Sequence, residues 1–366
     1  MMTRQLTLLS LYLFSTLVWS NAGNNLNDYW QYEDFLSVYP AQKTLVAELA
    51  EAVSSEPIRL SSTQLKPISI TVIYPGQQVS DYWRRNLKAF EVRLDKLNIK
   101  YELNQIFTRP GVDVDQQRIA LNEALIHKPD YIVFTLDSSE HSELIQDLLK
   151  RSQSKLILQN ITTPVKSWLK QPFLYIGFDH ISGTRMLVDY FKQAFPKGSR
   201  YSLLYFTEGY VSSMRGNVFN ELFQDPKNHK LSSFKYTDAT RASGYAMTKD
   251  LVSTDPKIDF IYACATDIAL GAVDALEEMG RQDIKVNGWG GGDAELLAIQ
   301  KNKLAATVMR LNDDIGIAMA EVIKSDIEGR DTPLVFSGKL KLITFSDNPT
   351  TIKRLKEQAF RYSKLE

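Results

Sequence analysis

The chain has 366 residues, with 43 Lys and Arg against 43 Asp and Glu, so its formal net charge at pH 7 is zero. A length of this order predicts two domains, at about 150 residues each. A neutral chain offers no broad electrostatic surface for nucleic acid or anionic lipid, and its single cysteine excludes an internal disulfide and a cysteine-based metal cluster. With 44% hydrophobic and 11% aromatic residues, the composition is that of a globular protein and not of a disordered one.

The first 22 residues are typical of a secretory signal peptide. Arg4 provides a weak positive start, an apolar run extends from Leu6 to Trp19, and Ser20-Asn21-Ala22 forms a small-residue cleavage site. The apolar run is too short for a membrane anchor, which needs about 20 residues. We therefore expect cleavage after Ala22 and delivery of the mature chain to a bacterial periplasm. An uncleaved chain that stays in the cytosol is the alternative.

Residues 23–66 differ from the rest of the chain, because they contain helical stretches such as Ala41–Val53 but no apolar strand run. We expect an N-terminal helical extension here. From Pro67 onward, short β-rich apolar runs alternate with amphipathic helices. The expected strands are Ile68–Tyr74, Tyr131–Leu136, Lys155–Leu158, Phe173–Ile176, Tyr201–Phe206, Phe260–Ala263, Lys285–Gly288 and Ala306–Met309. Strands that are apolar on both sides and alternate with helices predict parallel sheets covered by helices, in two lobes that exchange strands.

Polar side chains follow most of these runs, at the carboxyl ends of the expected strands, where ligands bind in open parallel sheets. They are Gln77, Gln78, Ser80, Thr135, Asp137, Asn160, Glu208, Thr266, Asp267, Trp289 and Arg310, and Arg215 lies on the helix after the run that ends at Phe206. This recurrence favours a ligand-binding cleft between two sheets.

Each of these residues also has an ordinary structural role as an alternative. Ser80 and Asp81 can cap the helix that begins near Tyr82. Trp83 can pack in the core on that same helix, and Asn160 can form a turn.

Arg310 directly follows the apolar run Ala306–Met309, and a charged residue at that point calls for a partner. One alternative is an ion pair with Asp313 or Asp314. We favour an anionic ligand instead, because a guanidinium stays charged and offers planar paired donors at the end of a strand that faces a cleft.

Enzyme motifs are mostly missing, since the chain has no GxSxG, GxxxxGK[ST] or HExxH sequence and no helix-turn-helix before the first strand. The histidines lack the spacing of metal ligands and are expected at the surface: His127, His141, His180 and His229. Cys264 lies in an apolar run and is expected to be a buried thiol. A secreted hydrolase that uses the loop Gly290–Gly292 is an alternative, although no serine–histidine pair accompanies that loop.

Three segments resemble the ribose- and galactose-type periplasmic binding proteins: Tyr262–Leu276, Val286–Gly292 and Leu304–Gly316. This resemblance implies an α/β fold of two Rossmann-like lobes with parallel sheets, joined by a three-crossing hinge, that closes on a ligand. The lobes would comprise residues 67–178 with 310–331 and residues 179–309 with 332–366.

Four segments are similar, more narrowly, to LuxP-like autoinducer-2-binding proteins of that family: Tyr74–Trp83, Leu156–Pro164, Tyr175–His180 and Asn287–Gly292. The similarity runs over nearly the whole mature chain. It implies a receptor that binds the furanosyl borate diester form of autoinducer-2 and regulates the periplasmic domain of a LuxQ-type membrane-bound hybrid sensor kinase. It implies no catalytic residue, no metal and no cofactor, although the ligand itself would contain boron.

The ligand-binding residues that the resemblance implies are Gln78, Ser80, Trp83, Asn160, Arg215, Thr266, Trp289 and Arg310, with Asp137 and Asp267 as further candidates. Two positions depart from the family patterns. Ala265 stands where we expect a serine, and Gly290 stands where sugar-binding relatives usually carry an acidic residue. The loss of that acid, together with two arginines, moves the expected ligand from a neutral sugar toward an anion. A sugar receptor that serves a transporter or chemotaxis is the alternative.

Overall fold

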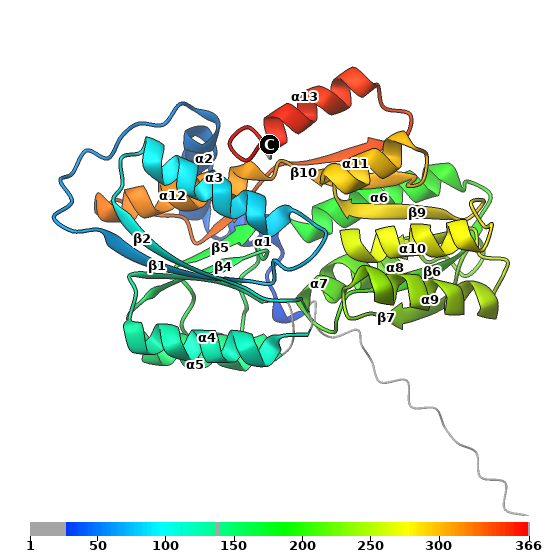
Figure 1. Cartoon of the computed structure of the whole chain (residues 1–366), viewed down its shortest axis with the longest axis horizontal. Helices are drawn as coiled ribbons and strands as arrows, with labels where there is room; N and C mark the ends of the chain where they lie inside the picture. Colours follow the sequence, from blue (N-terminus) through cyan, green and yellow to red (C-terminus); the bar gives the residue numbers. More distant parts are fainter. Residues whose placement is uncertain (1–26, 111, 137–139, 365–366) are drawn as a thin grey trace, which may run out of the picture.

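The computed structural model describes residues 27–110, 112–136 and 140–364. Two lobes lie side by side along the long axis of the molecule, and each is built on a six-stranded sheet (Figure 1). The expected signal peptide, residues 1–22, lies outside the described residues. No helix within the described residues has both the length and the apolar content that crossing a membrane requires.

The first lobe contains a sheet of strand order β11-β5-β4-β3-β1-β2. Its strands are β1 (Ile68–Tyr74), β2 (Tyr101–Phe107), β3 (Tyr131–Thr135), β4 (Lys155–Gln159), β5 (Leu174–Gly177) and β11 (Val335–Ser337). Its helices are α1 (Tyr32–Val38), α2 (Pro40–Ser54), α3 (Tyr82–Lys96), α4 (Val114–His127), α5 (Glu140–Arg151) and α12 (Asp313–Ile327). In Figure 1, α3 and α12 cover one face of this sheet and α4 and α5 cover the other. All the strand pairs of this sheet are parallel, and the central strands are buried because helices cover both faces.

The second lobe contains a sheet of strand order β12-β10-β9-β8-β6-β7. Its strands are β6 (Ser199–Tyr205), β7 (His229–Tyr236), β8 (Phe260–Ala263), β9 (Lys285–Gly290), β10 (Ala306–Arg310) and β12 (Leu340–Thr344). Its helices are α6 (His180–Ala194), α7 (Tyr210–Ser212), the π-helix η2 (Ser213–Asn217), α8 (Val218–Phe223), α9 (Arg241–Thr254), α10 (Thr266–Glu278), α11 (Asp293–Gln300) and α13 (Pro349–Ala359). β12 pairs with β10 in the antiparallel direction, whereas the other pairs of this sheet are parallel.

Three crossings join the lobes, as expected: they follow β5, β10 and β11. The expected boundary of the second lobe at residue 332 is wrong, because β11 pairs with β5 and therefore belongs to the first sheet. The last described residues also return to the first lobe. Arg85 of α3 lies over the ring of Phe360 and donates to the backbone oxygen of Ser363.

The expected N-terminal helical extension is present as α1 and α2, and it is an integral part of the first lobe. Leu49 and Val53 of α2 are buried in the same core cluster as residues of α3 and α12. Pro40 stands at the first position of α2, where its missing N–H costs no hydrogen bond.

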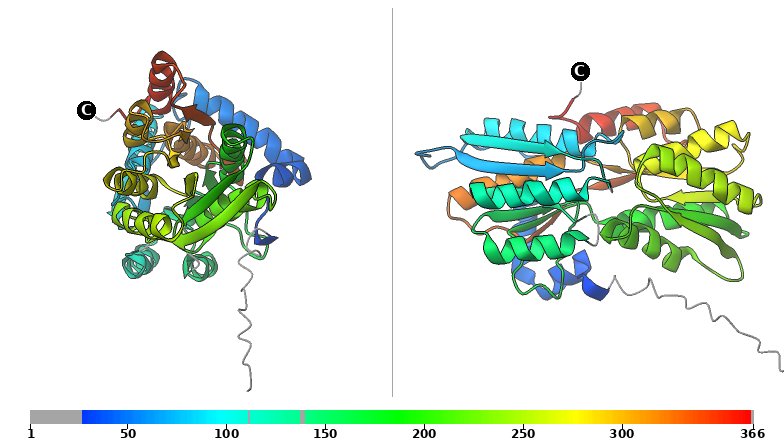
Figure 2. Two further views of the ribbon diagram at one scale, coloured as in Figure 1. Left: turned by 90° about the vertical axis from the view of Figure 1, so that its right-hand side faces the viewer. Right: turned by 60° about the horizontal axis from the view of Figure 1, so that its bottom comes forward.

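In a view turned by 60°, the two lobes remain side by side with α4 and α5 toward the viewer (Figure 2).

Candidate ligand-binding site

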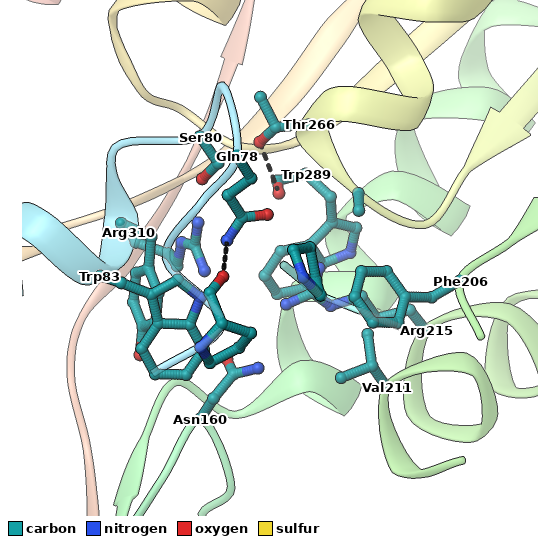
Figure 3. A pocket seen from close by; sticks show the side chains of 14 residues that line it. Gln78, Ser80, Trp83, Asn160, Phe206, Val211, Arg215, Thr266, Trp289 and Arg310 are labelled. Carbon is teal, nitrogen blue, oxygen red and sulfur yellow. Dashed lines mark hydrogen bonds between the residues drawn. The ribbon is translucent and has the colours of Figure 1, made fainter. Parts of the chain in front are cut away.

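One cavity between the lobes brings together the eight main site residues that the sequence predicts (Figure 3). They are Gln78, Ser80, Trp83, Asn160, Arg215, Thr266, Trp289 and Arg310. Pro75, Tyr82, Pro110, Phe206, Val211 and Ala265 complete the lining. The cavity lies where the carboxyl ends of the parallel strands of both sheets meet, as expected for an open α/β fold. That these residues bind a ligand stays a prediction.

Arg310 ends β10 and is only 6% exposed. Its guanidinium lies 4.0 Å from the centre of the Tyr82 ring, and its Nε has no hydrogen-bond partner among the described residues. The expected alternative of an ion pair with Asp313 or Asp314 is wrong. Asp313 accepts hydrogen bonds from the backbone of residues 362 and 363, and Asp314 pairs with Arg361 at 2.8 Å.

Arg215 lies in the π-helix η2 and is 4% exposed. Its Nε donates to Nδ1 of His180 at 2.9 Å, and its Nη1 donates to the backbone oxygen of Cys264 at 2.8 Å. The guanidinium stacks 3.8 Å from the centre of the Trp289 ring. Burial, and then the charge of Arg310, lower the pKa of Arg215 to about 9, so that it remains charged at neutral pH. Short π-helical insertions are frequent at functional sites.

Neither arginine forms an ion pair with a carboxylate in the part of the chain that the structure describes. Glu295 and Asp81, the carboxylates that attract Arg310 electrostatically, make their hydrogen bonds with other groups: Asp81 pairs with Arg85. The fully buried carboxylate of Glu295 accepts hydrogen bonds from the backbone of Trp289 and Gly291. Burying a charge without a partner is costly, so two such guanidiniums facing one cavity favour an anionic occupant.

Gly290 lies against two residues of the cavity lining, Thr266 and Arg310. A Cβ at this position would lie 2.6 Å from Oγ1 of Thr266 and 2.9 Å from Nη2 of Arg310. A side chain at residue 290 would therefore displace the Thr266 hydroxyl and the Arg310 guanidinium from their present positions, and an acidic one would neutralise that guanidinium. With a glycine here, residue 290 supplies no carboxylate to Arg310, which feels the attraction of Glu295 and Asp81 without forming an ion pair with either among the described residues.

Two buried polar atoms that lack a hydrogen-bond partner among the described residues belong to residues that line this cavity: Oδ1 of Asn160 and Nε of Arg310. Buried polar groups in folded proteins are nearly always hydrogen-bonded, so these two atoms indicate a place for a polar ligand. Ala265, the N-cap residue of α10, offers no side-chain cap, which leaves the positive end of that helix at the cavity.

Trp83 and Asn160 have the structural roles expected of them, core packing and turn formation, and both also line the cavity. Trp83 is 3% exposed and packs 4.7 Å from the ring of Tyr74, yet it also lines the cavity. Asn160 adopts a left-handed conformation, with φ of 67°, which turns the chain directly after β4. Packing and turn formation thus hold these side chains in place at the cavity wall.

The loop after β1 brings Gln78 and Ser80 to the cavity. The Nε2 of Gln78 donates to the backbone oxygen of Pro75 at 3.1 Å (Figure 3). The expected cap by Asp81 is wrong, because its carboxylate pairs with Nε of Arg85 at 2.6 Å and makes no capping hydrogen bond.

Asp137 lies outside the described residues, and Asp267 lies outside the cavity lining. The Asp267 carboxylate accepts hydrogen bonds from the backbone N–H groups of Val79 and Ser80 across the lobes, at 2.8 Å and 3.1 Å. Burial raises its pKa. Asp267 therefore bonds to the loop after β1 and does not line the cavity.

The expectation of surface histidines is wrong for three of the four, since His141, His180 and His229 are buried. His180 bonds to Arg215 and to the backbone of Asn160, which places it directly behind the site. In the sequence, the indication that His180 lies near the site is its place at the end of the segment Tyr175–His180, just after an expected strand. No group of three or more His, Cys, Asp and Glu side chains in residues 27–110, 112–136 and 140–364 is arranged to hold a metal ion.

Comparison with known proteins gives one family model, the periplasmic binding protein domain, which matches residues 70–331. The ribose import binding protein RbsB of Salmonella typhimurium is 28% identical over 170 residues, and that of Escherichia coli is 27% identical over the same length. These matches cover 46% of this chain and 57% of each relative. The chain therefore spans little more than half the length of the curated relatives it matches.

Solved structures of sugar-binding proteins share the fold. GanP, a glucose-galactose binding protein from Geobacillus stearothermophilus, aligns with a TM-score of 0.68 and 18% identity, over 78% of this chain and 100% of that one. An Agrobacterium radiobacter solute-binding protein in complex with D-arabinose gives 0.67 and 20% identity, over 80% and 99%. A Bacillus halodurans solute-binding protein with bound myo-inositol gives 0.67 and 17%, over 81% and 100%. At these identities, the likeness establishes the fold and leaves the ligand open.

Proposed function

Because the chain belongs to the periplasmic binding protein family, we propose that it is a periplasmic receptor that closes its two lobes on one small, hydroxyl-bearing anion. The specific ligand that we propose is the furanosyl borate diester form of autoinducer-2. Family membership places the chain among solute-binding proteins rather than enzymes. The observation that carries the proposal is the pair of buried guanidiniums of Arg215 and Arg310, which form no carboxylate ion pair in the described part of the chain.

The chemistry of this ligand fits the lining of the cavity. A tetrahedral borate carries a fixed negative charge, which is costly to bury unless it is paired and hydrogen-bonded. Arg215 and Arg310 would supply the positive charge that pairs with the borate. Gln78, Asn160 and Thr266 would bond to hydroxyl and ester oxygens. The side chain of Trp289 would cover an apolar ring face.

We expect the two lobes to close on the ligand because the cavity lies between them. It encloses only about 40 Å³ in this arrangement, so the lobes must part to admit a furanose-sized ligand. A ligand that contacts both lobes favours the closed state by its higher affinity for that state. The closed state would be read by the periplasmic domain of a LuxQ-type hybrid sensor kinase, a partner proposed from the resemblance in sequence. Export by a signal peptide cleaved after Ala22 is part of the same proposal.

A second candidate function is a neutral sugar receptor for an ABC transporter or chemotaxis. The ribose import binding proteins among the relatives, and the solved structures with D-arabinose and myo-inositol, support this candidate more directly than they support autoinducer-2. The uncompensated arginines weigh against it, because a neutral sugar would leave both positive charges unpaired.

Titration calorimetry of the purified protein distinguishes the two candidates. Autoinducer-2 is titrated with and without borate, and ribose and arabinose are titrated in parallel. Borate-dependent binding supports the first function. Binding of a neutral pentose without such dependence supports the second and contradicts the first. Boron NMR and mass spectrometry of the ligand released from freshly purified protein identify the natural occupant independently.

A further inference from the structure

His180 is the first residue of α6, at the first crossing between the lobes, and is only 1% exposed. Its imidazole meets two polar partners. Nε2 lies 2.9 Å from the backbone oxygen of Asn160 in the first lobe, and Nδ1 lies 2.9 Å from Nε of Arg215 in the second. The ring also packs against Trp289 and Tyr210, with centroids 5.3 Å and 5.6 Å away. His180 thus touches three residues of the candidate site or its lining, and none of the functions described above employs it.

The hydrogen bonds fix the chemical form of the ring. An arginine Nε–H can only donate, so Nδ1 of His180 must accept and Nε2 must carry the proton that bonds to the Asn160 oxygen. Only the neutral imidazole can do both. Burial, together with the charges of Arg215 and Arg310, lowers the pKa of His180 well below its usual value, which agrees with this neutral form.

The same contact restrains Arg215. Its Nε is held by His180, its Nη1 by the Cys264 backbone oxygen, and its flat face by the Trp289 ring. Two of its five N–H donors are used within the described residues, and the others remain for the cavity that Arg215 lines. A long side chain held at three points loses little conformational entropy when it binds an anion.

We propose that His180 is a positioning residue, which orients the Arg215 guanidinium toward the ligand and ties it to the turn at Asn160 in the opposite lobe. The inference rests on the proposed anion-binding function and assigns a role behind the site to a residue that does not line the cavity. An imidazole suits this role because it joins a donor to an acceptor across the crossing with one rigid ring.

Three substitutions separate the two hydrogen bonds. His180→Asn keeps an acceptor near the Nδ1 position, His180→Gln keeps a donor near the Nε2 position, and His180→Phe removes both. In ligand-free protein, ¹⁵N NMR of arginine side chains reports the Arg215 Nε–H directly, with Arg215→Lys to assign the signal. We expect a signal protected from exchange in the wild type and in His180→Asn, and its loss in the Gln and Phe variants. An unchanged signal in His180→Phe and His180→Gln would overturn the proposal.

Affinity for autoinducer-2 in the presence of borate gives the second measurement. We expect His180→Phe to weaken binding about tenfold or more and His180→Asn to stay within about threefold of the wild type. The matched control is His229→Asn, because His229 is also buried and bonded to Ser199 but lies at the start of β7. It should bind as the wild type does. Equal affinity in His180→Phe and the wild type, or equal losses in the Phe and Asn variants, would contradict positioning. If the wild type binds no autoinducer-2, the proposed function fails, and the NMR comparison still decides the role of His180.

Discussion

The carboxylate of Asp267, in the first turn of α10 in the second lobe, accepts a 2.8 Å hydrogen bond from the backbone N–H of Val79 in the first lobe. Its second oxygen accepts from the backbone of Ser80 at 3.1 Å. These bonds join the two lobes, so a parting of the lobes would break them. Asp267 therefore stabilises the arrangement of the lobes seen here without lining the cavity.

Loss of this contact is expected to weaken ligand binding. Asp267→Asn keeps one acceptor and loses the charge, whereas Asp267→Ala loses both bonds. Since hydrogen bonds to a charged acceptor are among the stronger ones, we expect affinity to fall in the order wild type, Asn, Ala, with a loss of about tenfold in the Ala variant. Small-angle scattering of the ligand-free protein should show a larger radius of gyration for Asp267→Ala. The control is Asp274→Ala on the same helix, whose carboxylate pairs with Arg241 within the second lobe. Equal affinities for Asp267→Ala and this control would contradict the role.

Removal of either buried guanidinium should weaken binding of an anion. We expect Arg310→Ala and Arg215→Ala to cost roughly 2–5 kcal/mol of binding free energy, on the scale of truncating one partner of a buried charge pair. Arg310→Lys should fall between the wild type and Arg310→Ala, because it keeps the charge and loses the planar paired donors. Calorimetry with the borated ligand measures each. Arg200→Ala, which breaks an exposed ion pair with Asp255, is the control. Unchanged affinity in both alanine variants would remove the argument for an anion.

A carboxylate at residue 290 should reverse the preference for charge. The Cβ of Gly290→Asp would point at Nη2 of Arg310, and the added acid would neutralise that guanidinium. Gly290→Asn has nearly the same shape without the charge, so the two variants share any steric cost near Thr266. We expect Asp to lower affinity for the borated anion at least about tenfold further than Asn does, as a like charge placed against the ligand would. If the natural ligand is a neutral sugar, calorimetry will instead show the Asp variant binding as well as the Asn variant or better.

The stability of the protein should depend on the ionisation of Asp313. Burial raises the pKa of this carboxyl to about 6 from its ordinary 3.8, although three hydrogen bonds from Tyr362 and Ser363 oppose the shift. The folded state therefore holds the proton more tightly than the unfolded state. As far as this group is concerned, the free energy of unfolding is highest below about pH 4 and falls as pH rises through 6, by about 3 kcal/mol in all.

Urea denaturation at pH 4.5 and pH 7 tests this dependence. Asp313→Asn does not ionise, so the stability of the wild type relative to this variant should decrease between pH 4.5 and pH 7. Asp255→Asn is the control: Ser232 and Arg200 lower the Asp255 pKa to about 2, so its ionisation is complete above pH 4.5. Parallel pH profiles for the wild type and Asp313→Asn would contradict the assignment.

The central strands were predictable because burial on both faces leaves a continuous apolar run in the sequence. β1 has the bounds predicted for it, Ile68–Tyr74, and β8 likewise spans Phe260–Ala263. β2 and β7 were missed because they lie at the edges of their sheets, where one side meets solvent and the apolar run is broken by Glu102 or Lys230. β11 is only three residues long and carries too little pattern to be recognised.

The resemblance in sequence supplied the set of eight main site residues, and the meeting of the carboxyl ends of parallel strands at one edge of a sheet accounts for those that follow strands, such as Asn160 and Arg310. The contacts of Asp81, Asp267 and His180 were not predictable. Asp267 lies 188 residues from Val79 along the chain, and its hydrogen bond depends on how one lobe faces the other. The spacing of apolar residues in the sequence indicates which face of a helix or strand is buried. It carries no information about which residue of the other lobe that element contacts across the cleft.

The burial of Cys264 means that the proposed closure of the lobes can be measured by spectroscopy. It is the one cysteine in 366 residues, and burial raises the pKa of its thiol to about 12, so it reacts slowly with maleimide dyes. Cysteines introduced at exposed positions of the two lobes, such as Leu169 and Phe345, can then be labelled selectively without removal of the native thiol. A donor and an acceptor dye at these positions would follow the distance between the lobes in single molecules as ligand is added.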